Sequence, residues 1–265
     1  MTRISSFFVA LIVAALLAAS LPGAVVGASV NKSDCSKPYW NSRTLPPPSI
    51  RVGITGRHDD VSATRVKRIK TVPFKRYVKT VMRVEFPGWI ANKRKGGAAY
   101  IAAGAVAAKQ YAWYWATQKP RYRFGGTCFD VYDNVRDQVY DPSVKQSVTA
   151  EAQTSAAVES TWDRVIRRQK RGGGSEFVLP FYLHDGQKAA GACGGTPPGY
   201  KRGYRMFRSN ALTCAKQGKS ANRILVRSYT SGDRDVATVG AAHGRRAVPR
   251  GRTRFAGGVQ LVDPV

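Results

Sequence analysis

Acidic residues are scarce in this sequence of 265 residues, where 16 Asp and Glu stand against 43 Lys and Arg and give a formal net charge of +27. A field of this sign attracts polyanions. Two interpretations stay open at this point: a specific anion site, or a basic surface that only keeps the protein soluble. Because no nucleic-acid-binding motif accompanies the charge, we expect no specific nucleic-acid partner.

The N-terminus lacks an apolar run long enough to span a membrane. The uncharged run at residues 7–17 is shorter than the ~20 residues that a membrane-spanning helix needs. It follows a short basic start and precedes a small-residue site at residues 26–28. This order predicts a signal peptide over residues 1–28 that is cleaved, rather than kept as a membrane anchor, and therefore a secreted protein.

The four cysteines include no C-x-x-C pair, which argues against a zinc ribbon or a dithiol redox motif. In an exported chain an even number of cysteines favours disulfides. Three pairings are possible, and the sequence does not choose among them. We favour the pairing of near neighbours in the chain, Cys35 with Cys128 and Cys193 with Cys214.

The sequence predicts four regions. They are the signal peptide at 1–28, an N-terminal lead with a first strand at 29–68, a main domain at 69–235 and a flexible basic tail at 236–265. The lead is rich in proline at residues 45–48, which prevents a helix there. The tail is polar, basic and poorly patterned.

The order of elements predicts an α+β fold, in which a buried Ala-rich helix packs with mixed short strands and further helices. That helix is expected at 98–117, because it is apolar on nearly all sides. An earlier helix is expected to end near Phe86, with Thr71 as its N-cap. The other expected elements are a strand at 49–54, a helix at 143–162, strands at 164–168 and 177–183, and helices at 205–215 and 220–229.

Glu85 stands out among only four glutamates. It continues the apolar stripe of the helix at i+4 from Val81 and i+7 from Val78. It also lies at the helix C-terminus, where the macrodipole disfavours negative charge. Both effects raise the pKa of a carboxyl group. A carboxylic acid that stays protonated near neutral pH can act as a general acid, although a pairing with Lys or Arg would give it a structural role instead.

Five short blocks resemble the stage II sporulation protein D / LytB family. They occur in order over roughly residues 70–232, and together they are more specific than any one alone. The blocks are residues 72–78 with 84–87, 103–112, 129–131 with 138–140, 157–161, and 215–220 with 224–225.

The resemblance implies a protein that acts on peptidoglycan. Family members include lytic transglycosylases and amidase enhancers, and Glu85 occupies the position of the family's catalytic glutamate. The matched blocks imply substrate contacts from four other residues, namely Lys109, Gln110, Gln138 and Tyr140. No cofactor is implied. The implied partners are peptidoglycan glycan strands, a wall amidase and, through charge, anionic wall polymers.

The sequence departs from the family pattern at several positions. Many relatives have a Cys and a His, able to hold zinc, where this chain has Tyr132 and Arg136, so we expect no metal there. Lys109 replaces an arginine and loses its bidentate fork. Residues 202–211 are a degraded family block, and His184 is only a loose counterpart of a family histidine.

Three functions follow as hypotheses. The first is a secreted lytic transglycosylase that cleaves the bond between N-acetylmuramic acid and N-acetylglucosamine, with Glu85 as the single acid and base. The second is a wall-binding amidase enhancer without catalysis. The third is an extracellular polyanion-binding protein, which rests on charge alone.

Overall fold

The computed structural model describes residues 35–169, 173–183, 192–196, 199–230 and 237–241. The expected signal peptide and His184 lie outside these residues. The fold is α+β, as the sequence predicts, with six helices among the described residues: α1 Phe74–Glu85, α2 Trp89–Lys93, α3 Gly97–Ala116, α4 Val148–Ser160, α5 Arg208–Lys216 and α6 Ala221–Tyr229. The strands are β1 Ser49–Ile54, β2 Arg68–Pro73, β3 Tyr122–Phe124, β4 Thr127–Phe129, β5 Val131–Tyr132, β6 Arg164–Gln169, β7 Ser175–Phe177, β8 Phe181–Leu183, β9 Arg205–Phe207 and β10 Ala237–Ala241.

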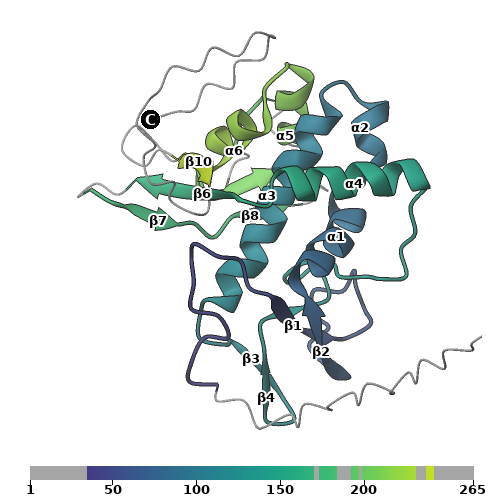
Figure 1. Ribbon diagram of the computed structural model, residues 1–265, viewed down its shortest axis with the longest axis vertical. Coiled ribbons are helices and arrows are strands. Elements are labelled where there is room, and N and C mark those ends of the chain that lie inside the picture. Colours follow the sequence, from purple (N-terminus) through teal and green to yellow (C-terminus); the bar gives the residue numbers. More distant parts are fainter. Residues whose placement is uncertain (1–34, 170–172, 184–191, 197–198, 231–236, 242–265) are drawn as a thin grey trace, which may run out of the picture. The chain divides into compact units, whose positions relative to one another are not determined.

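Helix α3 is the centre of the core. It packs against each of the other five helices described and against β6 and β8 (Figure 1). Most of its residues are buried, which confirms the expectation from its apolar composition. Its many alanines let the neighbouring elements approach closely on all sides. Among the described residues, no helix is long and apolar enough to cross a membrane.

Helix α3 also approaches its neighbours closely at Gly104. A Cβ atom at this position would lie 2.4 Å from the ring of Phe86, which is fully buried. Phe86 directly follows the last residue of α1, so this contact sets the distance between α3 and the C-terminus of α1.

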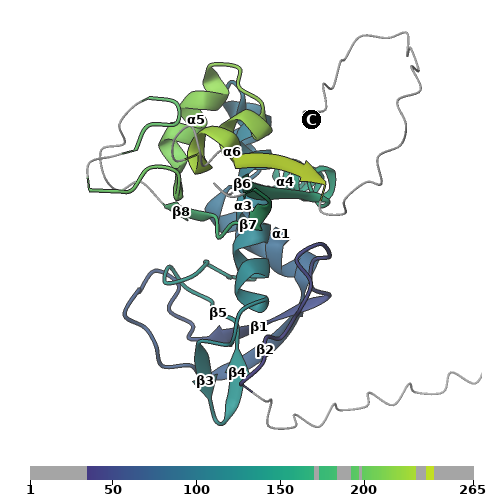
Figure 2. The same cartoon turned by 90° about the vertical axis from the view of Figure 1, so that its left-hand side faces the viewer.

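Strands β2, β1 and β5 form a sheet in that order, with β1 antiparallel to β2 and parallel to β5 (Figure 2). The prediction that Thr71 caps the first helix is wrong, because Thr71 lies in β2 and pairs with Arg51. The residue before Pro73 favours extended backbone, and pairing with β1 keeps this segment extended, so the helix does not begin at Thr71. Helix α1 begins at Phe74 without a side-chain cap.

A second sheet has the order β10, β6, β7 and is antiparallel throughout. The predicted tail at 236–265 is therefore wrong for Ala237–Ala241, which forms β10 against β6. Ala237 and Val239 are buried in this strand, so β6 stabilises a segment whose own sequence has little pattern. The rest of the predicted tail lies outside the described residues.

Two segments that were each predicted as one element form two elements in the structure. The segment expected as one strand at 177–183 ends one strand, β7, and then forms a second, β8. The helix expected at 205–215 begins only at Arg208, because Arg205–Phe207 forms β9 in parallel with β8. Both differences arise from pairing between distant segments, which local patterns do not contain.

The disulfides are Cys35–Cys128 and Cys193–Cys214, the pairing favoured from sequence. The first joins the beginning of the described chain to β4. The second joins residues 192–196 to α5.

Gly104→Ala should lower the free energy of unfolding by about 1–3 kcal/mol, because the added methyl group overpacks the contact with Phe86. This loss should appear although alanine favours a helix by about 1 kcal/mol over glycine. Urea unfolding measures the change. Gly240→Ala is the control, since nothing lies within 4 Å of its Cβ position, and equal losses for the two variants would contradict the packing argument.

Candidate active site around Glu85

Glu85 is the last residue of α1 and continues its buried face. The preceding members of the apolar stripe, Val78 and Val81, are fully buried, and the side chain of Glu85 is 12% exposed. The expected position of this carboxylate at the end of a core-facing stripe is therefore confirmed. The side chain therefore keeps a small contact with solvent.

The backbone of Val139 and the side chain of Arg208 contact the carboxylate from distant segments. The backbone N–H of Val139 donates to Oε1 at 3.2 Å. Arg208, the first residue of α5, places Nη1 3.4 Å from Oε2. Glu85 therefore joins three parts of the chain: α1, the segment that follows β5, and α5.

Arg208 is the site residue that sequence reasoning missed. It falls in the block at 202–211 that departs from the family pattern, and nothing in that stretch indicates which basic residue turns inward. Its side chain is 14% exposed, its Nε donates to the hydroxyl of Tyr100 at 3.3 Å, and its guanidinium lies 5.2 Å from the ring centre of Phe86. Arg208 therefore places a cation beside the carboxylate of Glu85.

Gln138 is buried and holds the segment that carries the Val139 N–H. Its amide nitrogen donates to Ala108 O at 3.0 Å and to the hydroxyl of Tyr182 at 2.8 Å, and its amide oxygen accepts from the hydroxyl of Tyr77 at 3.0 Å. All these partners are internal. Gln138 thereby positions the backbone beside Glu85, and the substrate contact expected of it from the sequence stays a prediction.

Tyr182 places a neutral phenol near the carboxylate. Burial, and after it the charge of Glu85, raises the pKa of Tyr182 well above its ordinary value, whereas the hydrogen bond with Gln138 lowers it. The phenol therefore keeps its proton at neutral pH. Its ring packs edge-on against Phe86, with centroids 5.1 Å apart.

Lys109, another residue expected to contact substrate, is 1% exposed and faces the protein interior. Its ammonium group donates to three carbonyl oxygens, those of Thr161 at 2.9 Å and of Trp162 and Arg164 at 2.6 Å each. Burial lowers the pKa of Lys109 to about 7, while three acceptors at these distances favour the charged form. The lysine fixes the turn between α4 and β6.

Gln110 and Tyr140 complete the predicted set and are buried as well. The side chain of Gln110 donates to the carbonyls of Ile166 and Val178 and accepts from the N–H of Ile166 at 2.6 Å. The ring of Tyr140 stacks on that of Tyr77 at 5.3 Å. Of the five predicted site residues, Glu85 is the one that is not fully buried, and the substrate contacts of the other four stay predictions.

The position where relatives carry metal ligands is aromatic in this chain. Tyr132 packs against Phe129 and Tyr122, and the guanidinium of Arg136 lies 5.7 Å from the Tyr132 ring centre. In the part of the chain that the structure describes, no group of three or more His, Cys, Asp or Glu side chains is placed to hold a metal ion.

Residues 62–167 match the family model described as SpoIID: Stage II sporulation protein. These residues are similar to a SpoIID domain. The match supports the SpoIID/LytB assignment and indicates a role related to sporulation or the cell wall. It includes Glu85 and all of α3, whereas Arg208 lies beyond it. No curated protein and no solved structure is significantly similar to the chain.

Lys109→Met should lower the free energy of unfolding by about 3 kcal/mol or more, because it leaves three buried carbonyl oxygens without their donor. Chemical denaturation of the purified variant measures this loss. Lys93→Met, at the exposed end of α2, is the control and should stay within about 0.5 kcal/mol of the wild type. If Lys109→Met unfolds with the same free energy as the wild type, Lys109 does not hold the turn between α4 and β6.

Proposed function

We propose that the protein is a secreted lytic transglycosylase of peptidoglycan in which Glu85 is the single acid and base. The observation that carries this proposal is the setting of Glu85 within the SpoIID match. The side chain is 12% exposed, accepts one backbone N–H and lies beside a cation and a neutral phenol. A carboxyl group that is mostly buried and held by hydrogen bonds in this way is typical of an acid that acts on a bound ligand.

The reaction needs one carboxyl group. Protonated Glu85 gives its proton to the oxygen between N-acetylmuramic acid and N-acetylglucosamine, and the bond from that oxygen to the muramic C1 breaks. The resulting carboxylate takes the proton of the muramic 6-hydroxyl, whose oxygen bonds to C1 and closes a 1,6-anhydro ring. No water is consumed, in contrast to hydrolysis by a pair of carboxylates.

Arg208 would act on the charge of Glu85 during this cycle. Its guanidinium stabilises the carboxylate that remains after proton transfer, since the two groups are 3.4 Å apart. It also disfavours the protonated form that begins the reaction. The Val139 N–H, which is fixed through Gln138, keeps the carboxylate oriented through both steps.

Glu85→Gln should abolish the release of anhydro-muropeptides from purified peptidoglycan, with a loss of at least about 100-fold, because glutamine cannot exchange a proton. Mass spectrometry of digests, with and without stem peptides, measures the products. Glu176→Gln changes a carboxylate that is 40% exposed in β7 and should retain wild-type activity. No anhydro product from the wild type would exclude the transglycosylase, and equal product from Glu85→Gln would exclude Glu85 as the acid.

Arg208→Gln should shift the alkaline limb of the pH profile of kcat to higher pH. Without the neighbouring cation, the protonated form of Glu85 persists to higher pH, and the acid step needs that form. Rates measured from pH 4 to about 9 provide the profile. An unchanged profile would mean that Arg208 does not act on the charge of Glu85.

A second candidate is a wall-binding amidase enhancer that does not catalyse. Two observations favour it: the ion pair of Glu85 with Arg208, which disfavours the acid form, and the burial of Lys109, Gln110, Gln138 and Tyr140. Its test is the activity of a wall amidase on peptidoglycan in the presence of wild type and Glu85→Gln. Equal stimulation by both, with no anhydro product from either, would establish this candidate over the first.

A further inference from the structure

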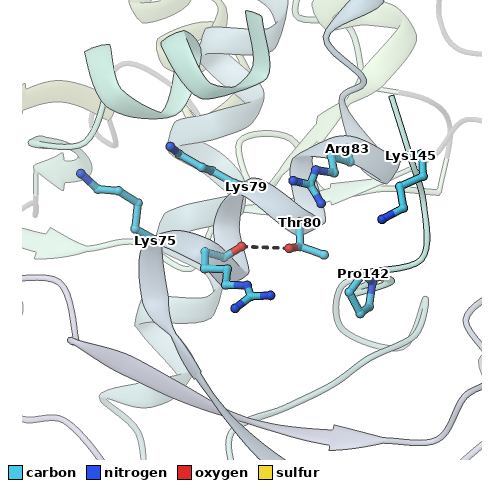
Figure 3. Close-up of a pocket in the computed structure, with 7 residues that line it drawn as sticks. Lys75, Lys79, Thr80, Arg83, Pro142 and Lys145 are labelled. Atoms are coloured by element: carbon cyan, nitrogen blue, oxygen red, sulfur yellow. Dashed lines mark hydrogen bonds between the residues drawn. The ribbon is translucent and has the colours of Figure 1, made fainter. Parts of the chain in front are cut away.

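A basic hollow lies between helix α1 and the segment that precedes α4. Its volume is about 370 Å³, and it is lined by Lys75, Arg76, Lys79, Thr80, Arg83, Pro142 and Lys145 (Figure 3). Five of these seven residues are cations, and none is acidic, aromatic or aliphatic apart from the proline. The lining therefore does not suit a metal ion or an apolar ligand.

Three of the five cations pair with α4. Lys75 and Lys79 contact the carboxylate of Glu159 at 2.7 and 3.0 Å, and Arg83 forms two hydrogen bonds with Glu151 at 2.7 and 2.8 Å. Lysines and arginine at i, i+4 and i+8 repel one another along a helix, and these glutamates offset that cost while they join α1 to α4. In Figure 3, Lys75 and Lys79 extend away from Lys145 and Pro142.

Arg76 and Lys145 are the two cations of the lining that do not pair with α4. Both are exposed, and no carboxylate in the described parts of the chain lies within ion-pair distance of either. They come from opposite walls, since Arg76 is on α1 and Lys145 is on the segment before α4. Gln146 donates to the carbonyl of Arg83 at 2.9 Å and so fixes that segment against the helix. Two glutamates against five cations leave the hollow with a net charge of +3.

We propose that this hollow binds phosphodiester groups of an anionic polymer that lacks bases, such as a polyol phosphate. Arg76 supplies a planar fork and Lys145 a point charge, and these two kinds of donor approach a phosphate from two sides. Lys75 and Lys79 share the single carboxylate of Glu159 and so add one further positive charge beside them. Proteins that bind single-stranded nucleic acid usually add aromatic side chains on which the bases stack, and the lining contains none.

The proposal does not depend on the transglycosylase. No lining residue belongs to the site around Glu85, although α1 contributes to both. The Glu85→Gln variant should therefore bind a phosphate polymer as the wild type does. Cleavage of polymer-free glycan should be unchanged when the hollow is altered.

Calorimetric titration of the purified protein with poly(glycerol phosphate) tests the site. The double variant Arg76→Gln/Lys145→Gln should bind about tenfold more weakly or worse, because it loses two charge-assisted interactions with phosphate. The control Arg94→Gln/Lys95→Gln removes the same two charges from an exposed segment after α2 and should weaken binding by less than about threefold. Inorganic phosphate, followed through the amide NMR signals of Thr80 and Lys145, should shift these signals in the wild type and the control only.

Three results would overturn the proposal. Equal weakening in both double variants would reduce the interaction to the overall charge of the protein. Poly-glutamate bound as tightly as the phosphate polymer, with the same sensitivity to Arg76→Gln/Lys145→Gln, would make the site one for carboxylates. A single-stranded oligonucleotide of equal phosphate number that binds more tightly than poly(glycerol phosphate) would assign the hollow to nucleic acid.

Discussion

The structure depends on two polar side chains in the middle of its most apolar helix. Lys109 and Gln110 are buried in α3 and satisfy the backbone where α4 ends and β6 begins. A buried ammonium group is costly unless every donor finds an acceptor, and here three carbonyl oxygens provide them. The same geometry leaves few alternative positions for β6 against α3. The specificity of the packing is thus set by hydrogen bonds as well as by apolar burial.

The environment of Glu85 is assembled from segments that each depend on α3. Gln138 hydrogen-bonds the carbonyl of Ala108 and so fixes the Val139 N–H beside the carboxylate. Phe86 packs on Gly104, which fixes the end of α1. Arg208 donates to the hydroxyl of Tyr100, another residue of α3. A single rigid helix thereby aligns three contacts that lie far apart in sequence.

The sequence predicts what depends on local pattern. The limits of α3 and the inward position of Glu85 follow from periodicity and the apolar stripe, and the structure contains both. The burial of Lys109 could not be predicted in this way, because its acceptors lie more than 50 residues away. The strand at 237–241 and the inward turn of Arg208 depend on partners that are equally distant. The family resemblance therefore drew attention to Glu85, but it did not predict the internal partners of Lys109 and Gln138.

Helix α1 contributes both to the basic hollow and to the proposed acid. Residues 76 and 85 are nine positions apart, and an α-helix rises 1.5 Å per residue, so their backbones are separated by about 14 Å. The intervening helix is continuous and held at both ends, by β2 and by Phe86. Because this helix fixes the spacing, a polymer bound by its charged group in the hollow could reach Glu85 only at a fixed distance along the polymer. The positions of the charged groups on a wall strand would then determine where that strand is cut.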